Sequence, residues 1–131
     1  MRLTLPIYHT IEKKRSANKT ILLGLNWFRN AYHFEQNNVK QAYHELVHSQ
    51  VGDSRFEQFT IQYLLFYKNS VCDPANIIAL VEKFLLDALQ STNTIPNDTV
   101  KYHLGSSWEV AGQDTINPRV EITIKDTNIN D

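Results

Sequence analysis

Residues 73–98, DPANIIALVEKFLLDALQSTNTIPND, carry the clearest structural signal in this chain of 131 residues. Between residues 76 and 90 the apolar side chains recur at steps of three and four, so they cover most of the circumference of a helix. A helix that is apolar on nearly every side is buried inside a domain. The stretch therefore predicts a buried helix over 74–90, around which the remaining elements pack.

The polar residues of this helix are mostly confined to one narrow line. Asn76, Lys83 and Asp87 fall within a sector of about 40°, because steps of seven and four residues nearly return to the same face. Lys83 and Asp87 also have the i, i+4 spacing of a helix salt bridge. Buried Lys and Asp are rare unless they are paired or take part in chemistry. The line is therefore both a candidate ion pair and a candidate functional surface.

An acid stands at each end of the same stretch. Asp73 precedes Pro74, which is a standard helix start, and Asp98 follows a loop where turn chemistry accounts for it. Carboxylates gathered with amide oxygens are also hard ligands that suit Mg²⁺ or Mn²⁺, and a nearby Lys83 can stabilise charge on a phosphodiester. Two interpretations of Asp73 and Asp98 therefore stay open. They either cap a helix and a turn, or they bind a metal ion.

Alternating apolar residues on either side of the helix predict strands over 2–7, 56–67, 99–110 and 119–125, and an amphipathic helix over 37–50. Residues 8–24 are predicted to be a loop and residues 25–33 a turn or short helical piece. The last two strands are expected to form a hairpin or a close equivalent. The order β-α-β-α-β-β predicts an α+β fold in a single domain over 1–131, with a mixed sheet of about four strands and helices packed on it.

Composition is that of a soluble globular protein, with 42% hydrophobic and 21% charged residues and a net charge of −1. The single cysteine, Cys72, excludes an intrachain disulfide and fits a reducing cytoplasm. We expect no membrane segment and no nucleotide cofactor, since no long apolar run and no Gly-rich phosphate loop occurs. Lys13, Lys14, Arg15 and Lys19 form a basic cluster, typical of a solvated loop or of a contact with nucleic acid.

The stretch resembles the RusA-like endodeoxyribonucleases, the phage-type Holliday-junction resolvases. In that family an Asp-x-Asp-Asn motif begins a helix that carries a Lys and an Asp-Ala-Leu, and an Asp-Asp pair follows a short loop. The corresponding residues here are Asp73-Pro74-Ala75-Asn76, Lys83, Asp87-Ala88-Leu89 and Ile95-Pro96-Asn97-Asp98. The N-terminal half is also similar, with a first strand ending in Leu5-Pro6 and an Asn- and Arg-bearing segment over 25–30. The likeness covers most of the chain, but its specific residues lie in 73–98.

The chain departs from the family pattern at three points. Ala75 replaces the second Asp of the first motif and removes one expected ligand. Asn97 replaces the first Asp of the loop pair, which keeps an oxygen and loses a charge. Lys83 lies about one helical turn further from Asn76 than in the familiar form, which preserves the face. We therefore expect a divergent member in which Asn76 or Asp87 takes the place of the missing carboxylate.

The resemblance implies a Mg²⁺-dependent (or Mn²⁺-dependent) homodimer that nicks four-way DNA junctions in recombination, repair or phage DNA processing. It implies Asp73, Lys83 and Asp98 as catalytic residues, and Asp73 and Asp98 as metal ligands assisted by Asp87 or Asn76. The implied DNA contacts are Lys13, Lys14, Arg15, Asn26, Arg29 and Asn30. The implied setting is the cytoplasm of a bacterial or phage-infected cell.

Two other functions stay open at the level of sequence. One is a non-catalytic DNA-binding domain of the same fold whose metal site has decayed, as Ala75 and Asn97 indicate. The other is a metal-dependent nuclease that acts on flaps or forks. The distance between the Asp73 and Asp98 carboxylates is the first observation that bears on a shared cation.

Overall fold

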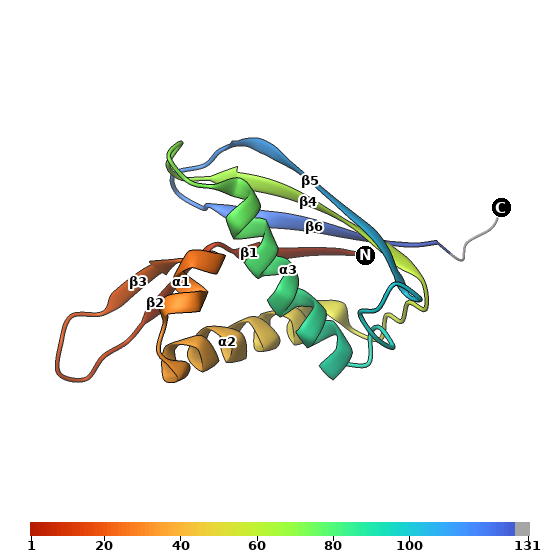
Figure 1. Ribbon diagram of the computed structural model, residues 1–131, viewed down its shortest axis with the longest axis horizontal. Helices are drawn as coiled ribbons and strands as arrows, with labels where there is room; N and C mark the ends of the chain where they lie inside the picture. The colour runs from red at the N-terminus through yellow and green to blue at the C-terminus, as the bar shows by residue number, and fades with distance from the viewer. Residues whose placement is uncertain (128–131) are drawn as a thin grey trace.

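Strand β4 (Phe59–Tyr67) is the centre of the molecule in the computed structural model, which describes residues 1–127. Its alternate side chains Phe59, Ile61, Tyr63 and Leu65 are buried, as the sequence predicts for the inner face of a sheet. The sheet has four strands in the order β1-β6-β4-β5 (Figure 1). The other three strands are β1 (Arg2–Pro6), β5 (His103–Gln113) and β6 (Arg119–Asp126).

The sheet is mixed, which confirms the predicted α+β fold. β4 runs parallel to β5 and antiparallel to β6, and β1 pairs antiparallel with β6. The parallel pair requires a crossover, and helix α3 (Pro74–Ser91) supplies it. Half of the α3 residues are buried, in line with its apolar circumference. The buried helix predicted over 74–90 is thus confirmed to within one residue.

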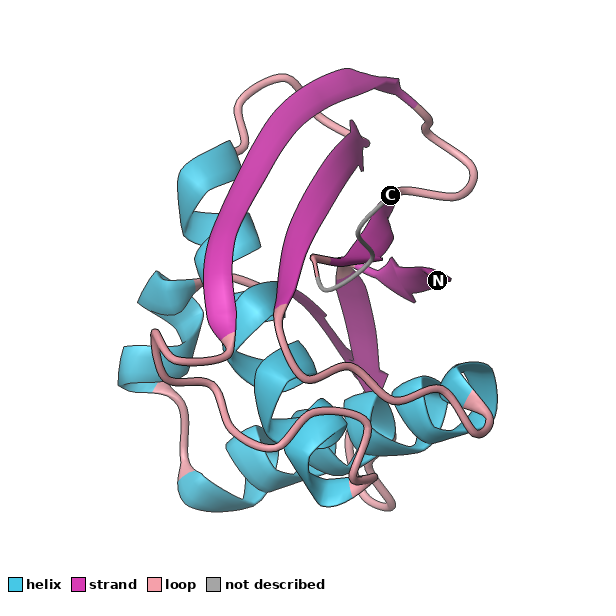
Figure 2. Ribbon diagram, turned by 90° about the vertical axis from the view of Figure 1, so that its right-hand side faces the viewer, coloured by secondary structure: helices cyan, strands magenta, loops and turns pink. Residues whose placement is uncertain are grey.

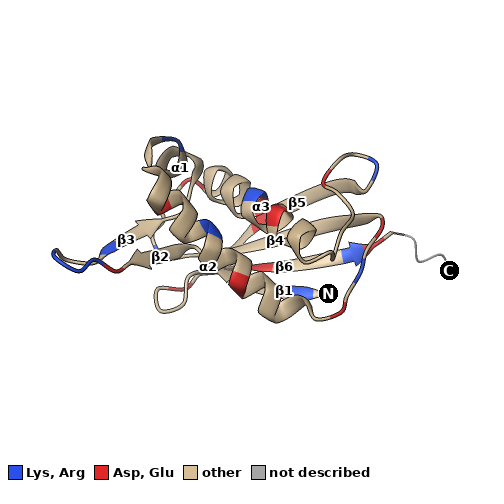
Figure 3. Ribbon diagram, turned by 90° about the horizontal axis from the view of Figure 1, so that it is seen from below, with Lys and Arg blue, Asp and Glu red and all other residues tan. Residues whose placement is uncertain are grey.

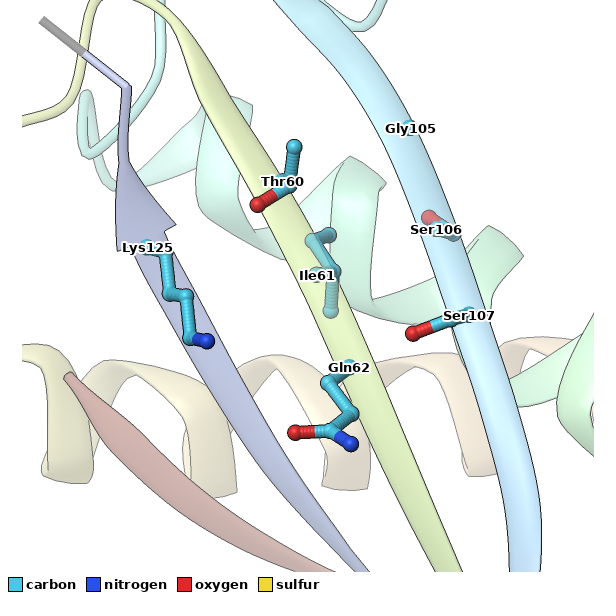
Figure 4. A pocket seen from close by; sticks show the side chains of 7 residues that line it. All are labelled: Thr60, Ile61, Gln62, Gly105, Ser106, Ser107 and Lys125. Carbon is cyan, nitrogen blue, oxygen red and sulfur yellow. The ribbon is translucent and has the colours of Figure 1, made fainter.

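The helices α1 (Leu25–Asn30), α2 (His33–Val51) and α3 gather on one side of the sheet (Figures 1 and 2). α3 packs on β4, and α2 packs across α3 and β1. The other face of the sheet carries no helix in residues 1–127, and Figure 4 shows Thr60, Gln62, Ser107 and Lys125 on it. The helix over 25–30 agrees with the predicted short helical piece. The longer helix begins at residue 33 rather than 37.

The sequence predicts a loop over residues 8–24, and this prediction is wrong. These residues form a two-stranded antiparallel hairpin, β2 (Tyr8–Ile11) and β3 (Lys19–Leu22), which extends from one end of the molecule (Figure 1). Ile11 and Ile21 are buried, so the paired part of the hairpin packs on the core. Each strand has four residues, too few to set up a clear period, which is why the pattern was missed.

The predicted hairpin of the last two strands is also wrong. β4 lies between β5 and β6, so these consecutive strands do not pair. The connection at 114–118 instead passes the end of β4, where the backbone N–H of Asp114 donates to the carbonyl of Tyr67. β5 begins at residue 103 rather than 99, because Thr99–Tyr102 form a turn closed by the Thr99 carbonyl. No helix within residues 1–127 is both long and apolar enough to cross a membrane.

Candidate functional site

Asp73 is the N-cap of α3, at the end of the sheet where β4 finishes. Its Oδ1 accepts a hydrogen bond of 3.2 Å from the backbone N–H of Asn76, and Pro74 occupies the first helical position. The Asn76 side chain lies against the backbone before α1, because a Cβ added to Gly24 would stand 2.8 Å from Asn76 Nδ2. Asp73 and Asn76 are therefore close together, as the motif requires.

Asp98 lies at the opposite end of the same helix. It is exposed in the loop between α3 and β5, where Asn97 Oδ1 accepts from the backbone N–H groups of Asp98 (2.7 Å) and Thr99 (3.2 Å). The 18 residues of α3 span about 27 Å. The chain after Asp98 enters β5 beside the start of β4, whereas Asp73 follows the end of β4. The structure therefore does not bring Asp73 and Asp98 of one chain together, as a cation shared between them would require.

Lys83 and Asp87 are not the buried pair that their spacing predicts. Lys83 is exposed and its Nζ lies 5.6 Å from the centre of the Phe28 ring of α1. Asp87 is partly exposed and pairs with Lys40 of α2 at 3.8 Å. The polar line of α3 thus faces the neighbouring helices, and the packing of α1 and α2 decides the partners. Along the helix, Lys83 stands about 15 Å and Asp87 about 21 Å from Asp73.

The predicted metal ligands do not form one cluster in the described part of the chain. Among the residues that the structure describes, no group of three or more His, Cys, Asp or Glu side chains is placed to hold an ion. Asp73 contributes one carboxylate and Asn76 one amide oxygen from the same helix end, and Mg²⁺ that also binds a substrate phosphate is usually held by one or two carboxylates. Asp87 does not supply the missing carboxylate, because it lies too far along α3.

The predicted DNA-binding residues gather at one end of the molecule. Lys13, Lys14 and Arg15 are exposed at the turn of the β2–β3 hairpin, which Figure 3 shows as a basic tip extending beyond the body. Arg29, Asn26 and Asn30 belong to α1, whose residues line a common cleft with Lys19 of β3. Asn30 Nδ2 donates to the Asn26 carbonyl at 2.8 Å. This surface, from the tip to α1, is the basic arm of the molecule.

A buried carboxylate that the sequence pattern did not indicate lies below this arm. Glu35 is 2% exposed, and its two oxygens accept from Lys19 Nζ at 3.0 and 3.3 Å. The ion pair joins β3 to the first turn of α2 and fixes the direction of the hairpin. Lys19 stands out in the sequence as a member of the basic cluster. Its partner Glu35 lies 16 residues further along the chain, so no local spacing indicates the ion pair.

A second polar network lies under β5. Glu82 Oε2 accepts from the Tyr63 hydroxyl and from Ser106 Oγ, both at 2.6 Å, and Ser106 also contacts His103 Nε2 at 2.7 Å. Burial raises the pKa of Tyr63 well above its ordinary value, and the charge of Glu82 raises it further. These bonds tie β4, α3 and β5 together, so we assign them to the stability of the crossover.

β5 is one of the two edge strands of the sheet, the other being β1, and it is exposed along most of its 11 residues. Leu104, Trp108 and Val110 are 50%, 43% and 46% exposed, an unusual number of large apolar side chains for one strand. Its central section has one charged residue, Glu109, and neither Lys nor Pro. Such residues normally protect an edge from pairing with another strand. The register with β4 shifts at Leu104 and at Ala111, and the regular section 105–110 between these points carries neither Lys nor Pro.

Comparison with known proteins gave no match, either to a family model or to a curated protein.

Proposed function

We propose that this chain is a metal-dependent endodeoxyribonuclease for branched DNA, and that it acts as a homodimer with metal sites shared between protomers. The family resemblance of residues 73–98 supplies the reaction class, cleavage of a phosphodiester in a four-way junction. The single structural observation behind the shared site is that Asp73 and Asp98 lie toward opposite ends of α3, beside opposite ends of the edge strand β5.

The topology supports an exchange of acids between protomers. Asp73 belongs to the carboxyl end of β5, because its neighbours Cys72 and Pro74 line one cavity with Val110. Asp98 precedes β5 by five residues, at its amino end. When two β5 edges pair antiparallel about a two-fold axis, the amino end of one strand lies next to the carboxyl end of the other. Asp98 of each protomer would then approach Asp73 of its partner.

The side chains of β5 suit this pairing. With the axis at Trp108, Glu109 would face Ser107 of the partner subunit, so no like charges would be opposed. The exposed Trp108 and Val110 would be covered, which removes apolar surface from water. A second copy is the occupant that also completes the acid set, and for this reason we favour it over an unrelated strand.

The donors brought together in this way are oxygens, which Mg²⁺ or Mn²⁺ prefers. Asp73 and Asn76 of one protomer would hold the ion with Asp98 of the other, while Asp87 and Lys83 would take no part. When bound, the metal supplies charge stabilisation for the attacked phosphodiester. The basic arm, with Lys13, Lys14, Arg15 and Arg29, would contact phosphates and set the orientation of the DNA.

Mixed dimers test the proposal. Asp73→Asn and Asp98→Asn are each expected to lower Mg²⁺-dependent nicking of a synthetic four-way junction by at least about a hundredfold. When the two variants are unfolded together and refolded, half of the dimers carry one intact site, so about a quarter of the sites should recover. Nicking products are measured on a denaturing gel with a labelled strand. Asp53→Asn, an exposed turn residue, is the matched control.

Failure of the mixture to recover activity, while each variant still dimerises, contradicts the shared site. A dimer that binds junctions but does not nick them with any divalent metal contradicts the enzyme itself. That outcome favours the second candidate, a non-catalytic DNA-binding domain. Ala75 and the separation of the acids within one chain are the observations that support this alternative.

A further inference from the structure

A cleft of about 410 Å³ lies at the base of the basic arm, between β3, α1 and the start of α2. It is separate from the acids at both ends of α3. Its lining combines aromatic rings, amides and one ion pair, contributed by Trp27, Tyr32, Asn26, Asn30, Lys19 and Glu35. Nothing in the nuclease chemistry proposed above uses this cleft.

Both aromatic residues of the cleft have a part that no other described residue satisfies, an exposed ring in Tyr32 and an unpaired N–H in Trp27. Tyr32 is 76% exposed, although a tyrosine ring is normally covered in part. The indole Nε1 of Trp27 is buried, yet it has no hydrogen-bond partner within residues 1–127. A buried N–H without an acceptor is unfavourable, and buried Trp normally finds one. The cleft therefore offers an open ring surface, and one of its lining residues carries a buried donor that lacks its acceptor among the described residues.

The polar residues of the cleft are close to neutral as a group. The ammonium of Lys19 is held by both oxygens of buried Glu35, so its charge is already balanced. The exposed amides of Asn26 and Asn30 add both donors and acceptors. An anion such as phosphate gains little here, because the carboxylate of Glu35 lies beside the only ammonium that lines the cleft. A flat, uncharged group with ring nitrogens and carbonyls fits better.

We propose that this cleft binds an unpaired nucleobase at the branch point of a DNA substrate. The basic tip formed by Lys13, Lys14 and Arg15 would hold the adjoining backbone, while the base stacks on Tyr32 and hydrogen-bonds to the amides. The inference rests on the DNA-binding half of the proposed function and not on its metal chemistry. Unpaired bases are the ones that can leave a duplex at the lowest energetic cost, which directs the cleft toward branched rather than fully paired DNA.

The experiment measures binding in EDTA, so that it does not depend on cleavage. The probes are a duplex with one unpaired 2-aminopurine and the same duplex fully paired. Tyr32→Ala is expected to weaken binding of the unpaired probe by about tenfold, because stacking of one base on an aromatic ring contributes about that much. Binding of the paired probe should stay unchanged. Phe34→Ala, which removes another exposed ring of the same helix end, is the matched control.

A second variant tests the donor alone. Trp27→Phe keeps the ring and removes the N–H, and it should weaken binding of the unpaired probe with no change for the paired one. Thermal unfolding monitors whether each variant folds. The proposal is overturned if Tyr32→Ala affects both probes equally, or affects neither. Loss of nicking with this discrimination intact would instead overturn only the nuclease.

Discussion

Asp114 closes the connection between β5 and β6, and its ionisation should be visible in stability. The backbone N–H of Asn117 lowers the pKa of this carboxyl, Arg119 Nη1 at 2.8 Å lowers it further, and the N–H of Ile116 adds to the effect. A pKa below the ordinary value of 3.8 stabilises the fold above that pH, and the contribution is lost as pH falls through the lowered value.

Asp114→Asn should therefore lower the melting temperature at neutral pH, and the difference from the parent should shrink as the pH falls below the ordinary pKa of 3.8 and through the lowered one. Thermal unfolding followed by circular dichroism over this range measures the effect. Asp53→Asn is the control for removal of a surface charge. A difference that stays constant with pH would show that the carboxylate charge is not what closes the turn.

Glu35 is the residue whose loss should loosen the hairpin. Glu35→Gln keeps the shape but removes the charge that holds Lys19, which is 47% exposed in its side chain. Because one partner is partly in water, we expect a loss of only about 1 kcal/mol in the free energy of unfolding, measured in urea. Amide exchange in β3 should rise as well. Glu45→Gln, exposed on the same helix, should change neither quantity.

At the scale of elements, the β2–β3 hairpin makes a prediction about salt. Replacing Lys13, Lys14 and Arg15 by Gln removes three exposed charges at its turn. If each contacts a phosphate, the slope of log affinity for DNA against log salt should fall by about 2.7 in magnitude. Fluorescence anisotropy with a labelled junction at several salt concentrations measures the slope.

The matched control is the same change of charge at the other end of the sheet, with Arg2, Arg55 and Lys125 replaced by Gln. This variant should leave most of the slope in place. Equal losses in both variants would mean that the chain's overall charge, rather than the arm, attracts DNA.

The elements that the sequence predicts well are those with a long period. β4 and α3 each have enough apolar repeats to identify both their type and their buried face. β2 and β3 do not, since four residues with one buried side chain each carry almost no pattern. The predicted pairing of β5 with β6 is wrong for another reason. A short connection makes two strands neighbours only when no third strand lies between them, and here β4 lies between β5 and β6.

At the scale of the whole molecule, the sequence predicts the local arrangement of the candidate site but not its long-range contacts. A helical wheel gives the face on which Lys83 and Asp87 lie, but the neighbours Phe28 and Lys40 come from distant parts of the chain. It also says nothing about the distance between Asp73 and Asp98, which the parallel crossover sets at the length of α3. Motif residues close in sequence are here separated by the fold.

The open edge of β5 leads to the last prediction, that Trp108→Lys with Val110→Lys keeps the chain monomeric. Lysine on an edge strand opposes pairing, and both side chains are already about half exposed, so the fold itself should stay stable. Sedimentation equilibrium should give the mass of one chain for this variant and of two chains for the parent. Ile116→Lys, 93% exposed outside β5, should remain dimeric. Because the proposed site takes Asp98 from a partner, the monomer should also lose metal-dependent nicking, and it should still bind DNA through its basic arm. A monomeric parent, or a monomeric variant with full activity, would contradict the shared site.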